Sequence, residues 1–72
     1  MAFNIFYISD NTQPNAGQII SYEEGDAIDP STAPAGQSIL TLPAVVDLFN
    51  GQPAGPVAMQ VNLTILQLVP IA

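Results

Sequence analysis

The sequence of 72 residues contains no cysteine, histidine, lysine, arginine or tryptophan. Without cysteine and histidine, the chain cannot form disulfides or the usual zinc sites, by which many small domains gain stability. It also lacks the side chains that most often serve as nucleophile or general base near neutral pH. The serine and threonine hydroxyl groups have only carboxylates to activate them. We therefore expect no enzymatic activity and no cofactor.

All charged side chains are acidic, and the six Asp and Glu residues give a formal net charge of -6 at pH 7. Binding to nucleic acid requires cations that displace counterions from the phosphate backbone, and anionic membrane surfaces attract basic segments. The composition therefore predicts that neither nucleic acid nor a membrane is a partner. A basic protein surface would be complementary in charge.

Long hydrophobic runs are missing as well. The N-terminus reads Met-Ala-Phe-Asn-Ile and lacks the basic region and apolar run of a secretion signal. The most apolar stretch, residues 57–72, is too short and too often interrupted by polar residues for a membrane-spanning helix. We expect synthesis in the cytoplasm.

The clearest pattern present is an alternation of apolar and polar residues over residues 57–65. The apolar members are Val57, Met59, Val61, Leu63 and Ile65, and the polar ones are Gln60, Asn62 and Thr64. A period of two places one set against a core and the other toward water, so the pattern predicts a β-strand. After Ile65 the apolar residues change face, which predicts a β-bulge or corner between Ile65 and Gln67.

Further segments have the aromatic and β-branched composition of strands, namely residues 3–9, 18–23 and 38–42. The loop between the first two has a length that suits antiparallel pairing. Between Pro43 and Asn50 the pattern fits one short helix, with Asn50-Gly51 as its stop. A strand over residues 44–49 is the competing interpretation. The β-branched Val45 and Val46 weaken the helix, and Pro53 weakens a returning strand.

Together these segments predict a mainly β fold with a small antiparallel sheet, sandwich or partial barrel. We expect four to five strands, at most one short helix (residues 43–50), and one domain over residues 1–72 with an extended Pro/Ala-rich arm at about 24–37. The side chains that we expect in the core are Ile5, Tyr7, Ile20, Val61, Leu63 and Ile65.

The acidic residues cluster between positions 23 and 29, where Glu23, Glu24, Asp26 and Asp29 lie. Loops rich in oxygen ligands bind calcium, and Gly25 would permit a tight turn there. The spacing does not match an EF-hand loop, and unpatterned acidic runs are usually solvated. A solvated loop is therefore the favoured interpretation, and calcium binding is a weak alternative. We expect no metal site.

A domain of this size buries little apolar surface relative to the conformational entropy it loses, so it benefits from a partner. Residues 3–8 are apolar on both faces, and one small domain has too few layers to cover both. We therefore predict contacts with another chain through Phe3, Phe6, Ile8, Leu66 or Leu68. The aromatic side chains would also suit a ligand-stacking platform, but core or interface is the commoner role of strand aromatics.

Two classes of function are compatible with these properties. The first is a structural subunit that decorates or cements a large particle, such as a virus capsid, and that self-associates, for instance as a trimer. In size and composition the chain is similar to small phage head-decoration proteins, although no motif carries this likeness; its mature location would then be the virion. The second is a small acidic binding module, an inhibitor or adaptor, that recognises a basic protein surface.

Overall fold

The computed structural model describes residues 2–49 and 58–71, and within them the fold is mainly β. The strands are β1 (Ala2–Ile8), β2 (Ile19–Gly25), β3 (Gln37–Leu42), β4 (Met59–Asn62) and β5 (Gln67–Pro70), and one 3-10 turn, η1, spans Pro30–Thr32. All strand pairs are antiparallel. The predicted fold class, with two small antiparallel sheets, is confirmed. No helix in the described part of the chain is long and apolar enough to cross a membrane.

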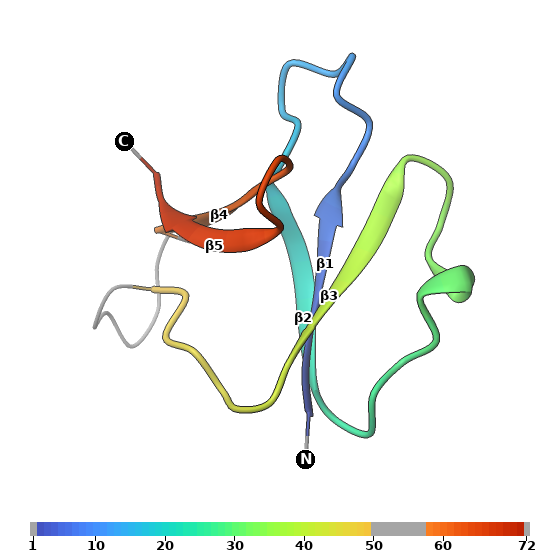
Figure 1. Ribbon diagram of the computed structural model, residues 1–72, viewed down its shortest axis with the longest axis vertical. Coiled ribbons are helices and arrows are strands. Elements are labelled where there is room, and N and C mark those ends of the chain that lie inside the picture. Colours follow the sequence, from blue (N-terminus) through green and yellow to red (C-terminus); the bar gives the residue numbers. More distant parts are fainter. Residues whose placement is uncertain (1, 50–57, 72) are drawn as a thin grey trace.

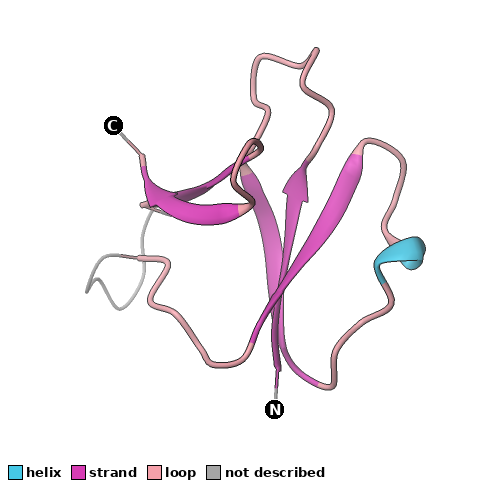
Figure 2. Ribbon diagram, in the orientation of Figure 1, coloured by secondary structure: helices cyan, strands magenta, loops and turns pink. Residues whose placement is uncertain are grey.

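The larger sheet has the strand order β2-β1-β3, so the N-terminal strand β1 lies at its centre. β4 and β5 form a separate hairpin, which lies on the β2 side of the larger sheet in Figure 1, with its turn end next to the start of β2. Figure 2 shows that loops and turns connect β1 to β2 and β4 to β5, and that η1 lies in the connection from β2 to β3. Because β1 has a neighbour on each side, its edges cannot pair with another chain.

The core lies between the larger sheet and the β4–β5 hairpin. Its buried apolar residues are Phe3, Ile5, Tyr7, Ile19, Leu48 and Val61. Leu40 and Leu42 of β3 pack against this cluster because they stand opposite Ile5 and Phe3 in the sheet register. The side of the larger sheet that bears these residues is called the inner face below, and the opposite side is called the outer face.

Ile5, Tyr7 and Val61 are buried as predicted, and Leu63 is half-buried against the core. The prediction for Ile20 is wrong, because its side chain is exposed and Ile19 takes the core position instead. The register shows the cause. Phe6 pairs with Ser21 and Tyr7 pairs with Ile19, so a bulge at Ile20 shifts the alternation of β2 by one residue.

The alternating stretch near the C-terminus is a hairpin, and the prediction of a bulge or corner between Ile65 and Gln67 is wrong. Residues 63–66 form a turn, and Ile65 is exposed on it, so the prediction that Ile65 lies in the core is also wrong. Asn62 begins the turn, because its side-chain Oδ1 accepts hydrogen bonds from the N–H groups of Thr64 (2.9 Å) and Ile65 (3.3 Å). The Leu66 N–H then closes the turn by donating to the Asn62 carbonyl oxygen over 2.7 Å.

The helix predicted from Pro43 to Asn50 is not present in residues 43–49, which form bends and a turn, and Asn50 lies outside the described residues. The alternative strand over residues 44–49 is not formed either. The Phe49 N–H donates to the Asp47 carboxylate over 2.9 Å, a local bond that competes with helical bonding. This segment instead delivers Leu48 to the core, and the Leu48 carbonyl accepts from the Ala58 N–H over 2.7 Å.

The two sheets are joined at Gly17. Its N–H donates to the Ile8 carbonyl over 2.7 Å, and its own carbonyl accepts from the Val61 N–H over 2.9 Å. The glycine has a φ of +89°, and a Cβ built there would lie 2.5 Å from the Val61 carbonyl oxygen. Glycine is therefore required both by the backbone conformation and by the close approach of β4.

Candidate functional site

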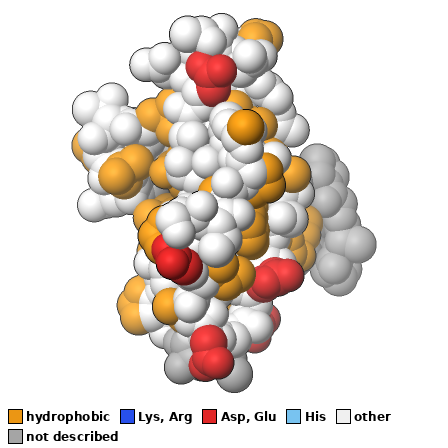
Figure 3. Space-filling model, turned by 90° about the vertical axis from the view of Figure 1, so that its right-hand side faces the viewer, with side chains coloured by type: hydrophobic (Ala, Val, Ile, Leu, Met, Phe, Trp, Pro, Cys, Tyr) orange, Lys and Arg blue, Asp and Glu red, His pale blue; other side chains and the backbone are white. Residues whose placement is uncertain are grey.

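The outer face of the larger sheet carries apolar side chains that the chain covers only in part. Phe6 stands directly opposite Ile39, and Ile8 stands opposite Gln37. Phe6, Ile8 and Ile39 are all half-buried, whereas the inner-face residues of β1 are buried. We call these three residues the outer apolar patch. Seen from the side of β3, hydrophobic side chains run down the middle of the molecule and acidic groups lie around them (Figure 3).

At the other end of the outer face, Asn4 forms hydrogen bonds with the segment that follows β2. Its side chain is almost fully buried, with 1% of its surface exposed. Its Nδ2 donates to the Asp26 carbonyl over 3.0 Å, and its Oδ1 accepts from the Ile28 N–H (3.1 Å) and the Thr41 hydroxyl (2.9 Å). The start of the connection between β2 and β3 is thereby held on the sheet. It covers the face at Asn4, whereas the residues of the outer apolar patch are only half-buried.

The stretch 24–37, which we expected to form an extended arm, contains the end of β2, the turn η1 and the first residue of β3. Asp29 begins η1, because its carboxylate accepts from the Ser31 N–H over 3.0 Å. The Thr32 hydroxyl donates to the Asp29 carbonyl over 2.7 Å. These local bonds give the connection a defined path beside β3 (Figure 1).

The structure divides the predicted interface residues among different places. Phe3 is 1% exposed in the core of the protomer, where it packs under Tyr22 with ring centroids 5.6 Å apart. Phe6 and Ile8 share the outer face. Leu66 is 52% exposed on the hairpin turn, and Leu68 is half-buried against the core. The predicted set is therefore not one surface, and its coherent part is Phe6 with Ile8.

Leu66 has a backbone φ of 53°, a left-handed conformation that residues other than glycine and asparagine rarely adopt. The turn imposes this conformation through the short bond to the Asn62 carbonyl. An exposed leucine in the left-handed region places apolar surface at the tip of the hairpin at a cost in backbone energy.

The acidic residues between positions 23 and 29 do not converge. Glu23 pairs with Asn4 and Glu24 with Phe3, so their side chains leave β2 on opposite faces. The Asp29 carboxylate serves the start of η1. Among the residues that the structure describes, no three acidic side chains are grouped so that they could hold a metal ion. Each carboxylate in this stretch faces solvent.

Two aspartates have pKa values below the ordinary range because of local hydrogen bonds. The Thr12 hydroxyl donates to the Asp10 carboxylate over 2.6 Å and the Thr12 N–H donates over 3.0 Å, which lowers the pKa of Asp10. The Ser31 N–H and hydroxyl lower the pKa of Asp29 in the same way. Both bonds favour the ionised form, so both groups are carboxylates at neutral pH.

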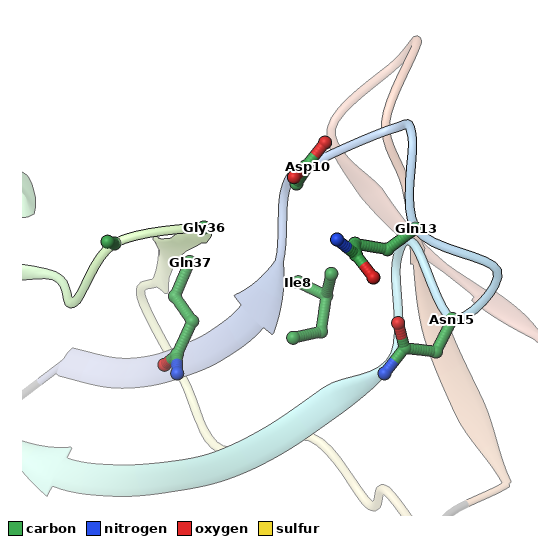
Figure 4. Close-up of a pocket in the computed structure, with 7 residues that line it drawn as sticks. Ile8, Asp10, Gln13, Asn15, Gly36 and Gln37 are labelled. Atoms are coloured by element: carbon green, nitrogen blue, oxygen red, sulfur yellow. The ribbon is translucent and has the colours of Figure 1, made fainter.

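A pocket of about 410 Å³ lies where β1 ends and β3 begins. Its lining residues are Ile8, Asp10, Gln13, Asn15, Ala35, Gly36 and Gln37. Gln13 and Asn15 reach toward Ile8 from the loop that follows β1, and Gln37 lies on the other side (Figure 4). Sequence analysis missed this site, because its polar members sit in turn-forming stretches and nothing in their spacing shows that the two loops meet.

The buried side-chain polar atoms of the described residues all have hydrogen-bond partners. What the arrangement offers is contact surface, consisting of the outer apolar patch and the polar pocket that adjoins it through Ile8.

Comparisons of the chain with protein-family models, with curated proteins and with solved structures found no match.

Proposed function

We propose that this protein is a non-enzymatic structural subunit that joins a larger protein assembly through the outer face of its larger sheet. The observation that supports this most is the outer apolar patch, whose three side chains are only half-buried and lie toward the end of β1 at Ile8. The type of assembly we propose is a virus capsid shell, on which the chain would act as a decoration or cement protein. Self-association, for instance as a trimer, is part of the proposal.

The physical reason is the incomplete cover on β1. Its inner face is buried by the β4–β5 hairpin and by Leu48, whereas on its outer face Asn4 is buried and Phe6 and Ile8 are only half-buried. Apolar patches on a sheet face that remain open to water are a common mark of protein contact sites. Covering such a patch by a second chain would remove apolar surface from water, at a gain of about 25 cal/mol for each Å².

Edges of the larger sheet offer a second mode of contact within the same proposal. β3 is an edge strand, and the turn η1 is in contact with it. An edge strand presents backbone groups that another chain can pair with. A partner that extends the sheet at β3 would lie beside Ile39 and would thereby also reach the outer apolar patch.

The test is a comparison of Phe6→Ser with Val45→Ser. Both variants remove an apolar side chain, but Val45 lies outside the sheets and is exposed. We expect Phe6→Ser to weaken self-association, measured by sedimentation velocity up to high micromolar concentration, and to weaken co-sedimentation with the particle that carries the native protein. Val45→Ser should leave both unchanged. Thermal unfolding of each variant verifies that the protomer is still folded.

The proposal fails if the wild-type chain stays monomeric at these concentrations and co-sediments with no particle. It also fails if Phe6→Ser and Val45→Ser behave alike. Ile39→Ser provides an independent variant on the same face, should Phe6→Ser not fold.

A second candidate is a small acidic binding module for a basic protein surface. It is favoured by the absence of any basic side chain and by the exposure of Glu23, Glu24, Asp26, Asp29 and Asp47. Salt separates the two candidates, because contacts between exposed charges are screened over about 8 Å at physiological ionic strength. A complex that dissociates between low and high salt supports the module, and one that persists supports the apolar contact.

A further inference from the structure

We propose that the pocket at the end of β1 binds an arginine side chain of a partner protein. This inference rests on the proposed function in one respect, namely that the arginine belongs to the chain that covers the outer face. The pocket lies beside that face, because Ile8 belongs both to its lining and to the outer apolar patch.

The walls of the pocket are held by backbone hydrogen bonds and are therefore formed before any ligand arrives. The Gln13 N–H donates to the Asp10 carbonyl over 3.1 Å, and the Gln37 N–H donates to the Pro34 carbonyl over 3.0 Å. The Ser9 N–H joins the two walls by donating to the Gly36 carbonyl over 3.0 Å. The volume of about 410 Å³ falls within the ordinary range for ligand sites.

The lining offers acceptors that are suited to a planar, charged donor group. Asp10 supplies a carboxylate at the rim. Its Oδ1 already accepts from the Thr12 N–H and hydroxyl, so Oδ2 is the oxygen that would receive the guanidinium. The side-chain amides of Asn15 and Gln37 make no hydrogen bond to any described residue, so their carbonyl oxygens are available. Guanidinium presents five N–H donors in one plane and meets several such oxygens at once. Ile8 provides an apolar surface against which the methylene stem can lie.

The negative charge of the chain favours a cationic ligand that another molecule supplies. The net charge is -6 and there is no lysine or arginine, so no side chain of this protein can neutralise Asp10. The same charge disfavours anionic ligands. A neutral sugar would find hydrogen-bonding partners in the amides but would gain nothing from the carboxylate charge, and for this reason we favour arginine.

The test is a titration of the isolated, isotope-labelled protein with N-acetyl-arginine amide, followed by the side-chain amide NMR signals of Asn15 and Gln37. N-acetyl-citrulline amide, which has nearly the same shape without the charge, is the matched ligand. We expect saturable shifts of both amide signals with the arginine compound. The citrulline compound should bind at least about tenfold more weakly, since hydrogen bonds to charged groups are the stronger ones.

Asp10→Asn is the matched variant, because asparagine can still accept the hydrogen bonds from Thr12 that shape the loop. It should weaken arginine binding by about tenfold or more. Glu24→Gln removes the same charge from the far end of the sheet, next to Phe3, and should change binding little.

Equal binding of arginine and citrulline, or of a neutral sugar in their place, would overturn the inference. So would equal effects of Asp10→Asn and Glu24→Gln, since that result would indicate a general attraction by net charge. Because the titration uses the isolated protomer, it does not depend on assembly. The comparison of Phe6→Ser with Val45→Ser measures assembly alone, so the failure of one proposal is distinguishable from failure of the other.

Discussion

Gly17→Ala tests the joint between the two sheets, where the larger sheet and the β4–β5 hairpin meet. An alanine there would have to adopt a φ of +89°. The left-handed region costs an L-residue roughly 1–2 kcal/mol. The new Cβ would also lie 2.5 Å from the Val61 carbonyl oxygen, which belongs to backbone and cannot move aside alone.

The displacement of β4 adds to this cost. It would weaken the bond from the Val61 N–H to the Gly17 carbonyl, now 2.9 Å long, and a typical bond of this kind contributes roughly 0.5–1.5 kcal/mol. The lower entropy of alanine in the unfolded chain offsets about 0.4–1 kcal/mol. We expect Gly17→Ala to lower the free energy of unfolding by about 1–3 kcal/mol, a large share of the total for a small domain.

Gly36→Ala is the matched control for this experiment. Gly36 has a similar φ of +78°, but a Cβ built there has nothing within 4 Å. Gly36→Ala should therefore lower the free energy of unfolding only through the left-handed backbone conformation, by about 1 kcal/mol after the entropic offset. Urea unfolding followed by circular dichroism gives both values. If the two variants are destabilised equally, β4 does not approach Gly17 as described, and the packing of the hairpin on the larger sheet is refuted.

The remaining predictions concern the core, the buried amide and the loop that follows β1. Val61→Ala should lower the free energy of unfolding by about 1–4 kcal/mol, and unchanged urea unfolding would contradict its place in the core. Asn4→Asp should lower the free energy of unfolding by roughly 1–3 kcal/mol at neutral pH, because the buried Nδ2 donor to the Asp26 carbonyl is lost. The loss should be smaller below about pH 4, where a protonated carboxyl group can donate instead, and a loss that does not change with pH would contradict this explanation. Thr12→Val should raise the pKa of Asp10 toward the ordinary aspartate value, as carboxyl NMR can measure. In the wild type, the lowered pKa of Asp10 stabilises the folded state at pH values above the ordinary aspartate pKa. This stabilisation is lost as the pH falls through the pKa that Asp10 has in the folded protein.

Sequence analysis succeeded where a single strand carries its own pattern. The strand around Ile5 and Tyr7 is apolar and β-branched, and its burial follows from alternation alone. The predicted strands over residues 18–23 and 38–42 also agree with β2 and β3. The fold class followed from these segments.

Sequence analysis failed where one residue changes which side chains of a strand face the core. The bulge at Ile20 depends on how β2 meets β1, and a slip of one residue exchanges which side chain enters the core. At Asn62 the choice between a continuing strand and a turn depended on a side-chain hydrogen bond that alternation does not report.

The site was only partly visible in the sequence. The apolar character of both faces of β1 pointed to Phe6 and Ile8, which lie on the outer face, and also to Phe3, which is buried on the inner face. The pocket joins loops that are about 20 residues apart along the chain, so no local pattern contains it.

Side-chain oxidation footprinting tests the central claim most directly. The native particle and the isolated protomer are exposed to hydroxyl radicals, and the labelling of Phe6 is compared with that of Tyr22, which is 41% exposed on the inner face. If another chain covers the outer face, Phe6 will be labelled in the protomer and protected in the particle, while Tyr22 changes less. Equal labelling of Phe6 in both states would contradict the claim that the outer face is the contact surface.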